Sequence, residues 1–531
     1  MIVQHKLNRA FLLLLASCFP LLVLVIVLAL TAVPPAQAQV VIYVDDDTCP
    51  ATGSGSQNTP YCRIQDAVNA ANDFYEIRVA TGTYTGVTAV PVMQWEGIYT
   101  YTQVVIITKS LTLRGGFAPD DWHTSDPAAN PTVIDAEQQG RGLSLVGTIS
   151  QNPFATVDGF IITGGNYTGL GNPTGVSNRQ CDDEGADCGG GFYAYYSGFN
   201  LRHSIIRDNT ASQNMGAGGG IYFAHLSAPS RIENTQVISN SNAGLRSNSG
   251  GLYGISVIHP LTISHCLFQN NVASTASGLF LAYNIEAPIT IQDTDFLHNV
   301  AETGEAAGAR IRLVADGHLL QMDRVRFQNN QAHDRAGALY IDAAGPFTPQ
   351  VRLTNLLFSG NSLQMANADD ALVAISGGFA NMNVEMAHIT AADNSARTFL
   401  YVEPNSSPGR FVNVHLQNVL LSSFDYAFAA QEWEEGEVVV QHDNTLTQYV
   451  ATLHHTMGGT PTFTATNPLL GDPKLSATYH LQAGSAAIDA GVEAGVATDL
   501  EGDLRPSGAA PDVGADEFVV FQLFVPLVLQ P

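Results

Sequence analysis

Hydrophobic and polar residues alternate along most of the chain in short runs that end at Asn or Gly. Residues 203–209, for example, read His-Ser-Ile-Ile-Arg-Asp-Asn, and a second apolar run follows at 219–223. β-Branched and aromatic residues fill the apolar positions, and the runs lack the 3.6-residue period of an amphipathic helix. The pattern predicts a mainly β protein of short strands joined by tight turns.

These runs recur with a nearly fixed period. Seven segments align without gaps, and their starts lie 31, 31, 28, 31, 31 and 33 residues apart: 203–209, 234–240, 265–271, 293–299, 324–330, 355–361 and 388–394. Such a period indicates a solenoid, propeller or array, because no single unit can bury its apolar face alone. We expect stacked coils of three short strands, paired into parallel sheets at roughly 4.8 Å per coil.

An Asn ends each of the seven segments, shortly before a small-residue step such as Gly219-Gly220-Ile221 or Gly250-Gly251-Leu252. Asn tolerates the left-handed backbone conformation, and stacked Asn side chains can exchange amide hydrogen bonds. We therefore expect a column of left-handed Asn residues that are hydrogen-bonded from coil to coil.

The chain on either side of the seven segments divides into further regions. Residues 39–165 hold the N-terminal cap and first coils, with strands expected at 41–44, 76–84, 104–107, 111–117, 132–135 and 157–163. An amphipathic helix at 63–71 would cover the open end of the solenoid. The repeats occupy 166–465, and the longer spacing between Asp158 and His203 predicts an insertion near 170–188.

The first 38 residues have the features of a signal peptide. Lys6 and Arg9 precede an apolar run from Phe11 to Val33, and small residues stand around Ala38. This order predicts export and cleavage after Ala38. The run is also long enough to span a bilayer, so an uncleaved anchor is the alternative. Both predict an extracellular or cell-surface protein.

Cysteine spacing agrees with export. Cys49 with Cys62, and Cys181 with Cys188, are close in sequence within loop-forming stretches, so we predict two local disulfides formed in an oxidising compartment. Cys266 lies in an alternating apolar run and is predicted to be a buried, inert thiol.

Composition narrows the classes of function. Acidic residues number 48 against 22 basic ones, giving a net charge of −26, while charged residues make up 13% and hydrophobic residues 45% of the chain. The hydrophobic fraction argues against an acidic disordered protein. The negative charge, with only three Lys, excludes nucleic acid as a partner.

Short-spaced carboxylates suggest a metal ligand set. Asp182, Asp183, Glu184 and Asp187 stand between two paired Cys, and further groups occur at 45–47 and at 499, 501 and 503. Calcium accepts such ligands, whereas zinc would need a matching Cys/His pair nearby. The alternatives are a structural calcium at Asp182, Asp183, Glu184 and Asp187 or a solvated acidic loop. We expect no required cofactor.

The repeats resemble those of a known family. The Phe-x-x-Asn signatures at 268–271, 296–299, 327–330 and 358–361, with the Gly-Gly steps, resemble the repeats of the polymorphic outer-membrane-protein adhesins. That family belongs to the right-handed parallel β-helix, or pectin-lyase-like, class. The resemblance implies an all-β fold: a right-handed parallel β-helix solenoid with an N-terminal capping helix.

Residues 466–517 resemble a second family. The segments 467–473, 479–491, 498–506 and 511–517 are similar to the choice-of-anchor module that follows β-helices in surface-exported bacterial proteins. The resemblance implies a small C-terminal β module and attachment to the cell envelope. The apolar tail at 518–531 is then either a terminal strand or an anchoring signal.

Catalytic candidates come from the first position of the seven aligned segments: His203, Asn234, His265, Asp293, Arg324, Asn355 and His388. Adjacent coils would bring His265, Asp293 and Arg324 within steps of about 5 Å. Enzymes of the pectin-lyase-like class use calcium with a basic residue in lyases, or paired carboxylates in hydrolases. The other interpretation of the column is a polar turn ladder, since four residue types occur in it.

Aromatic residues near the Gly steps complete the picture: Tyr193, Tyr195, Tyr196, Tyr222, Phe223, Tyr253, Phe280 and Tyr340. They are expected either to stack inside the solenoid or to offer a face to an extended glycan. We predict an exported, non-catalytic surface protein that is adhesive or binds glycans, with an extracellular polysaccharide or surface glycan as partner. The alternative is an extracellular polysaccharide lyase or glycoside hydrolase.

Overall fold

The computed structural model describes residues 39–95, 97–171, 181, 187–242, 244, 247–317, 319–365, 370–404, 409–432 and 436–519. The chain from Val41 onward forms one compact unit, and Gln39 and Val40 lie outside every helix and strand. The predicted signal peptide, and the apolar tail beyond Val519, lie outside the described residues and stay predictions. None of the described helices is long and apolar enough to cross a membrane.

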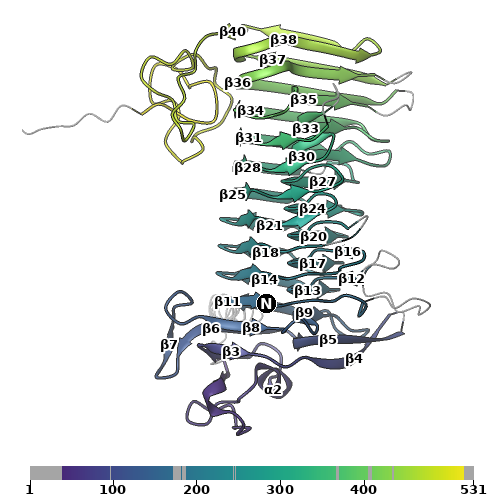
Figure 1. Ribbon diagram of the computed structural model, residues 1–531, viewed down its shortest axis with the longest axis vertical. Coiled ribbons are helices and arrows are strands. Elements are labelled where there is room, and N and C mark those ends of the chain that lie inside the picture. Colours follow the sequence, from purple (N-terminus) through teal and green to yellow (C-terminus); the bar gives the residue numbers. More distant parts are fainter. Residues whose placement is uncertain are drawn as a thin grey trace, which may run out of the picture. The chain divides into compact units, whose positions relative to one another are not determined.

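The chain winds into stacked coils whose strands pair in parallel into three long sheets (Figure 1). Sheet 1 contains β1 (Val41–Val44), β2 (Glu76–Ala80), β6 (Leu111–Ala118), β10 (Phe154–Asp158), β14 (Gly198–Arg202), β18 (Ser230–Glu233), β21 (Leu261–Ser264), the first parts of β25 (Ile289–Leu297), β28 (Leu319–Gln328), β31 (Gln350–Ser359), β34 (Met382–Ala392) and β36 (Phe411–Gln431), then β37 (Glu437–Asp443) and β39 (Thr462–Thr466).

Sheet 2 contains β3 (Gly82–Tyr84), β8 (Thr132–Asp135), β11 (Phe160–Thr163), β15 (Ile205–Arg207), β19 (Gln236–Ile238), β22 (Leu267–Gln269), the later parts of β25, β28, β31 and β34, the middle of β36, the start of β38 (Leu446–Gly458) and β40 (Leu469–Leu470). Sheet 3 contains β5 (Gly97–Ile107), β9 (Arg141–Val146), β13 (Phe192–Tyr195), β17 (Ile221–Ala224), β20 (Leu252–Ile255), β24 (Leu279–Ala282), β27 (Ala309–Leu313), β30 (Ala336–Ala343), β33 (Ala371–Ser376), β35 (Thr398–Glu403) and the ends of β36 and β38. The fold is a right-handed parallel β-helix, which confirms the predicted fold class.

Short strands complete the coils and the ends. β23 (Val272–Ala273), β26 (Val300–Ala301), β29 (Gln331–Ala332) and β32 (Ser362–Leu363) form a small parallel sheet, and β12 (Asp187–Cys188) pairs with β16 (Gly216–Ala217). A 3-10 helix (Asp46–Thr48) and α2 (Ile64–Ala70) lie at the N-terminal end, where α2 packs Ile64, Ala67 and Val68 against the first coil. The capping helix is therefore confirmed, one residue shorter at each end.

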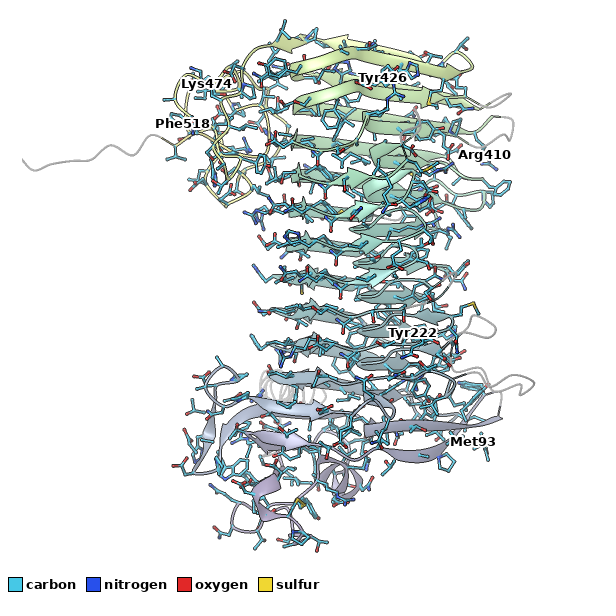
Figure 2. The ribbon with its side chains drawn as sticks, viewed as in Figure 1. Met93, Tyr222, Arg410, Tyr426, Lys474 and Phe518 are labelled. Atoms are coloured by element: carbon cyan, nitrogen blue, oxygen red, sulfur yellow. A yellow bond between two sulfur atoms is a disulfide. The ribbon has the colours of Figure 1, made fainter. Side chains whose placement is uncertain are left out.

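Two antiparallel pairs extend the first coils beyond the repeat pattern. β4 (Thr88–Gln94) folds back on β5, and β7 (Asp121–Ser125) folds back on β6. Met93, labelled in Figure 2, lies on the first of these hairpins. Neither hairpin belongs to the repeat, so the repeat period did not predict them.

A buried Asn ladder runs along the inside of the solenoid. Its members are Asn209, Asn240, Asn271, Asn299, Asn330, Asn361 and Asn394. Each of the first six donates from its backbone N–H and from Nδ2 to Oδ1 of the next member, at 2.9–3.2 Å. The predicted coil-to-coil hydrogen bonds are confirmed.

The backbone conformation of the ladder Asn differs from the prediction. The left-handed residue is the one before it, as at Ser239, Asn270 and Asn329, where φ is 54–55°. A second left-handed position is the aligned column from His203 to His388, with φ between 45° and 57°, where the chain turns from sheet 1 into sheet 2. Because a neighbouring residue takes the left-handed turn, each ladder Asn is free to direct its amide inward.

Aromatic residues divide between two sides of the coil. Phe268, Phe296, Phe327 and Phe358 stack inside the core at 5.0–5.1 Å between ring centroids. Tyr193, Tyr222 and Tyr253 stack on the other side of sheet 3, outside that core. Tyr222 is labelled in Figure 2.

These outer tyrosines are nevertheless buried, because Cys181, Cys188 and Ala217 pack with them in a separate apolar cluster. The prediction of an open aromatic face is therefore wrong for these three tyrosines. The alternative prediction, stacking inside the solenoid, is also wrong for them, since their rings lie outside the main core. Phe223 does lie in the main core, whereas Tyr196 is half-buried. The loops that connect the strands of each coil therefore determine whether these aromatic side chains are buried.

Residues 471–519 form a loop-rich module beside the later coils, where Figure 2 labels Lys474 and Phe518. Its described residues contain two isolated β-bridges but no strand, so the expected β module is mainly turns. Buried polar contacts hold these turns. Asp499 accepts from the backbone N–H groups of Glu501, Asp503 and Glu517, and Arg505 pairs with Glu517 at 2.8 Å.

The module docks on the continuation of the left-handed column. Asn355 Nδ2 donates to Thr498 O at 2.9 Å, and Asn418 both donates to and accepts from the backbone of Val492, at 2.7 and 2.8 Å. Leu357, Leu500 and Ala515 form an apolar contact beside them. The same turn column is therefore exposed at His203, Asn234 and His265 but covered further along.

Candidate functional site

The predicted catalytic residues lie together on the outside of the solenoid. Arg324 donates to both carboxylate oxygens of Asp293, at 2.6 and 2.9 Å, and also pairs with Asp323. His265 Nε2 lies 3.7 Å from Asp293, and 57% of its side chain is exposed. Hydrogen bonding to Asp293 raises the pKa of Arg324, so this guanidinium stays charged and is unsuited to accept a proton. The group has the properties of a surface ion-pair network.

A second, more buried charge cluster lies on the outer side of sheet 3, over β27, β30 and β35. We call it the Arg310 cluster, and it consists of Glu305, Arg310, Arg312, Arg335, Tyr340, Asp342, Tyr401 and Glu403. Strand alternation positions its members. Ala309, Ile311 and Leu313 of β27 point into the core, so Arg310 and Arg312 point outward. Register then places Tyr340 beside Arg310 and Asp342 beside Arg312.

Arg310 lies between two carboxylates and two aromatic rings. Its Nη1 pairs with Glu305, and its Nε lies 3.4 Å from Oδ1 of Asp342. The guanidinium carbon lies 5.0 Å from the ring centroid of Phe280 and 4.7 Å from that of Tyr340. Cation–π contacts of this kind fix the guanidinium in place.

The remaining members extend the network to the next coils. Arg312 Nε lies 2.5 Å from Oδ2 of Asp342. Arg335 donates to Glu403 at 2.9 Å and to the Tyr340 hydroxyl at 3.2 Å. The Tyr401 hydroxyl donates to the other oxygen of Glu403 at 3.0 Å. Three carboxylates and three guanidinium groups are thus interleaved on one sheet face.

The environment separates the two carboxylates that Arg310 joins. Burial raises the pKa of Glu305, and the negative charge of Asp342 adds to this, although Arg310 and Arg335 oppose it. Asp342 accepts from two guanidinium groups. Burial also raises the pKa of the Tyr340 hydroxyl. Two carboxylates thus pair with one guanidinium, and burial raises the pKa of one of them, Glu305.

The arginines of the cluster remain cations. Burial opposes the charge of Arg335, but Glu403, Tyr340 and Glu305 outweigh it and raise its pKa. Burial likewise opposes the charge of Arg312, and Asp342 outweighs it, so that its pKa is also raised. These groups can bind anions or stabilise negative charge, while Glu305 is the group suited to proton transfer.

The sequence carries no separate signal for this cluster. The steps Gly308-Ala309-Arg310-Ile311 and Gly337-Ala338-Leu339-Tyr340 are typical of the repeat and predict only a strand after a turn. Arg310 could have drawn attention, because the two preceding repeats have Tyr253 and Phe280 in its register. Glu305 and Arg335 come from loops, and only the folded coil brings them to the strands.

The carboxylates proposed for calcium differ in their contacts. Asp45, Asp46 and Asp47 bring one ligand atom each within 4.8 Å of one another. Asp187 accepts from the backbone N–H of Gly169 at 2.8 Å and from the Ser212 hydroxyl at 2.8 Å. Asp182, Asp183 and Glu184 lie outside the described residues, so calcium at that loop stays a prediction. Asp45 caps the short 3-10 helix through Asp47 N–H.

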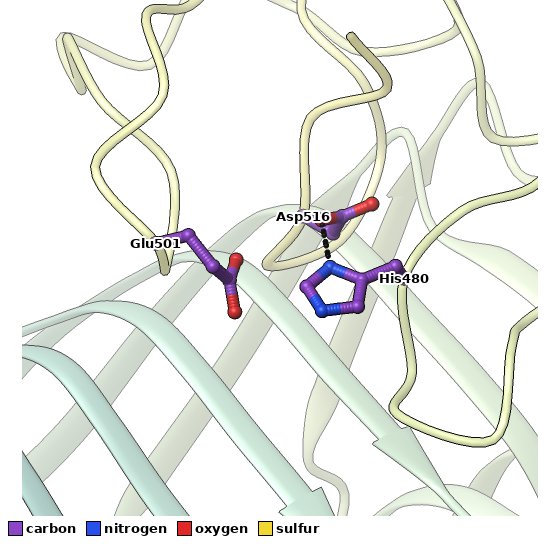
Figure 3. A group of neighbouring side chains, drawn as sticks. All are labelled: His480, Glu501 and Asp516. Carbon is purple, nitrogen blue, oxygen red and sulfur yellow. Dashed lines mark hydrogen bonds and ion pairs between the residues drawn. The ribbon is translucent and has the colours of Figure 1, made fainter.

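His480, Glu501 and Asp516 bring one ligand atom each within 4.8 Å of one another in the C-terminal module (Figure 3). His480 Nδ1 lies 2.8 Å from Asp516, and Glu501 accepts from Arg326 of β28 at 2.9 Å. The hydrogen bond to Asp516 raises the pKa of His480, and burial raises that of Glu501. The contact between Glu501 and Arg326 joins this part of the module to the solenoid.

The cysteines lie as the spacing indicated. Disulfides join Cys49 to Cys62 and Cys181 to Cys188. Cys266 is free and buried, and burial raises its pKa to about 12, which makes it a poor nucleophile. None of the five contributes to the Arg310 cluster.

No family model and no curated protein matches this chain. Among solved structures, it is similar to the crystal structure of pectate lyase Pel9A, with 12% identity and a TM-score of 0.43 over 91% of this chain and 97% of that one. A second similar structure is the catalytic unit of thermostable GH87 α-1,3-glucanase from Streptomyces thermodiastaticus strain HF3-3, with 11% identity and a TM-score of 0.36 over 82% and 69% of the two chains. At these sequence identities, no functional residue of either structure can be assigned to a position of this chain.

Proposed function

We propose that this protein is an extracellular glycoside hydrolase that acts on a polysaccharide at the Arg310 cluster. The observation that carries the proposal is the pair Glu305 and Asp342, which both pair with the Arg310 guanidinium, while burial raises the pKa of Glu305. The cluster meets solvent mainly at Glu305 and Arg312, whose side chains are 20% and 26% exposed, whereas that of Asp342 is 9% exposed.

The two carboxylates have distinct roles. Protonated Glu305 donates its proton to the glycosidic oxygen as the bond from that oxygen to the anomeric carbon breaks. Asp342 either takes a proton from the attacking water or attacks the anomeric carbon itself, after which water releases the sugar. In both cases one water is consumed and one new reducing end forms.

Hydrolysis fits the cluster better than lyase chemistry. A lyase needs a base that removes a proton beside a uronate, commonly an Arg or Lys. Here acidic partners raise the pKa of Arg312 and Arg335, which keeps both protonated. Arg312 and Arg335 are therefore unsuited to accept a proton from a uronate.

The proposal includes export of the protein and its attachment to the cell envelope. Two disulfides are typical of proteins that fold in an oxidising compartment. The predicted signal peptide at 1–38 would deliver the chain there. The module that begins after β40, with its resemblance to choice-of-anchor modules, and the adhesin-like repeats support a role at the cell envelope.

The test is to incubate the purified chain with a panel of neutral and acidic polysaccharides and to measure new reducing ends and new unsaturated ends separately. We expect reducing ends alone. Glu305→Gln should lower the rate by about 10²–10⁴-fold, because it removes the proton donor but keeps the side-chain shape. Asp293→Asn, in the other charge cluster, is the matched control and should leave the rate unchanged.

Three outcomes would overturn the proposal. Unsaturated ends would indicate a lyase. Activity that survives Glu305→Gln but is lost in Asp293→Asn would move the site to the left-handed column. A folded protein without product on any polysaccharide would support the non-catalytic, adhesive or glycan-binding protein that the sequence predicts.

A further inference from the structure

A polar groove crosses the outer side of sheet 1, on strands that do not contribute to the Arg310 cluster. It has a volume of about 790 Å³ and runs over β28, β31, β34, β36 and β37. The inward residues of these strands, such as Val351, Val384 and Val414, pack in the core, so alternation turns their neighbours toward the groove.

One row of side chains follows the groove from coil to coil. Register pairs Gln321 with Arg352, Arg352 with Glu385, Glu385 with His415, and His415 with Gln441. Stacked strands lie roughly 4.8 Å apart, so the five positions extend over about 20 Å. A groove of this length fits a chain of several sugar units better than a single small molecule.

A second row of amides runs beside the first. Gln350, Asn383 and Asn413 are in register, and Asn413 Nδ2 donates to Asn383 Oδ1 at 3.2 Å. Each amide offers both donors and an acceptor, which suits the hydroxyl groups of a sugar. The two rows together give β31, β34 and β36 a pair of polar side chains each: Gln350 with Arg352, Asn383 with Glu385, and Asn413 with His415.

The charges in the groove are balanced. Arg352 stands opposite Glu385 in register, and His415 Nε2 lies 2.9 Å from Asp443. The remaining polar groups are neutral amides, so the groove has no excess of positive charge for a uronate or phosphate polymer. This composition favours a neutral ligand.

The C-terminal module bounds the groove on one side. Ala494 lines a smaller adjoining cavity together with Arg352, Glu385 and His415, and Arg352 Nη2 donates to Gly495 O at 3.5 Å. The module therefore gives the open sheet face a wall, which a flat solenoid surface would lack.

We propose that this groove binds an extended neutral polysaccharide, with about one sugar unit for each coil. The proposal goes beyond hydrolysis, because the groove lies on a different sheet and its function is to hold a chain rather than to cleave it. It would keep the protein on an insoluble or cell-bound polysaccharide while the Arg310 cluster acts elsewhere on the solenoid.

The test is affinity electrophoresis of the full chain in gels that contain a neutral β-glucan, a xyloglucan, an α-1,3-glucan or polygalacturonate. We expect retardation by a neutral polysaccharide, little changed by salt, and at least tenfold weaker binding in Arg352→Ala. Arg231→Ala is the matched control, because Arg231 occupies the same row of sheet 1 in an earlier coil, through Thr262 and Thr290, and lies outside the groove.

Gln441→Ala, at the other end of the row and exposed, is the second variant if Arg352→Ala loosens the module. Its binding should also weaken, at unchanged thermal stability. The proposal is overturned if no neutral polysaccharide retards the protein, if polygalacturonate alone does, or if Arg231→Ala weakens binding as much as Arg352→Ala. The Glu305→Gln variant should bind the polysaccharide as the unchanged protein does. The experiment therefore distinguishes a failure of the proposed hydrolysis from a failure of the proposed binding.

Discussion

The buried Asn ladder shows how one residue type can fix the stacking of coils. Asn299 donates from its backbone and from Nδ2 to Asn330, and it accepts two hydrogen bonds from Asn271. Its Nδ2 also donates to Phe268 O in the preceding coil. Buried amides must be satisfied in this way, because an unpaired polar group in the core is costly.

Asn299→Ala should therefore destabilise the solenoid by about 3–5 kcal/mol, since it leaves buried partners on both neighbouring coils without hydrogen bonds. The measurement is the shift of the urea unfolding midpoint. Asn69→Ala, at an exposed position of α2, should lower the free energy of unfolding by less than about 0.5 kcal/mol. Similar shifts for the two variants would contradict a structural role of the ladder.

The two charge clusters also differ in how far their residues could be predicted to meet. Asp293 and Arg324 share a turn column, so their alignment in sequence was enough to predict that they meet. Glu305 reaches Arg310 from a loop, and its pKa depends on burial by neighbouring coils. Desolvation is a property of the packed structure, and no sequence spacing reports it.

At the scale of strands, the final coils differ from the rest in their core. In the register where earlier coils have Leu353, Met386 and Leu416, β37 has His442. His442 lies buried between Phe428 of β36 and His454 of β38, with ring centroids 4.7 and 5.1 Å away. Its Nε2 lies 2.8 Å from Nε2 of His454. Burial, and then the neighbouring His454, lower the pKa of His442 to about 4.

The stability of these coils should therefore depend on pH. Between about 4 and the ordinary 6.5, the unfolded chain binds a proton at His442 that the folded protein does not. Stability is full above 6.5 and falls by about 1.4 kcal/mol for each pH unit below it. Thermal unfolding at pH 7 and pH 4.5 measures this loss.

His442→Phe, which keeps a ring in the stack, is the informative variant for this pH dependence. The difference in melting temperature between pH 7 and pH 4.5 should shrink in it. An unchanged pH dependence would mean that other groups, such as buried His388 with a pKa lowered to about 3, account for all of it.

At the scale of the whole molecule, the solenoid and the C-terminal module share one set of turns. Asn418 and Asn444 continue the left-handed column and donate to the module at Val492 and Ala490. Docking covers this part of the column and creates a wall of the polar groove. The position of the module therefore matters for the proposed binding site as well as for attachment.

Asn418→Ala should loosen the module, because it leaves the backbone N–H and C=O of Val492 without partners. We expect limited proteolysis within residues 471–517 to become at least about tenfold faster while the solenoid stays intact. Asn234→Ala controls for backbone strain, since Asn234 has a similar left-handed φ, 50° against 56°, but is exposed. Equal cleavage rates in the two variants would show that this contact does not hold the module.

The architecture could be predicted from the amino-acid sequence. A period near 31 residues with an Asn at each step is satisfied when neighbouring units stack, and the stacked parallel coils and the contact between Asp293 and Arg324 follow from that regularity. The capping helix and the two disulfides follow instead from a local amphipathic pattern and from cysteine spacing. Local alternation and repetition are properties of the chain, so they can be read from it.

The tertiary structure alone decided which surfaces are available for function. Irregular loops cover the outer tyrosines, carry Glu305 to Arg310, and place the C-terminal module beside Arg352. The left-handed turn fell one residue before each ladder Asn, because the amide had to face inward. Burial, desolvation and closure of the coil depend on contacts between distant residues, which the repeat pattern does not contain.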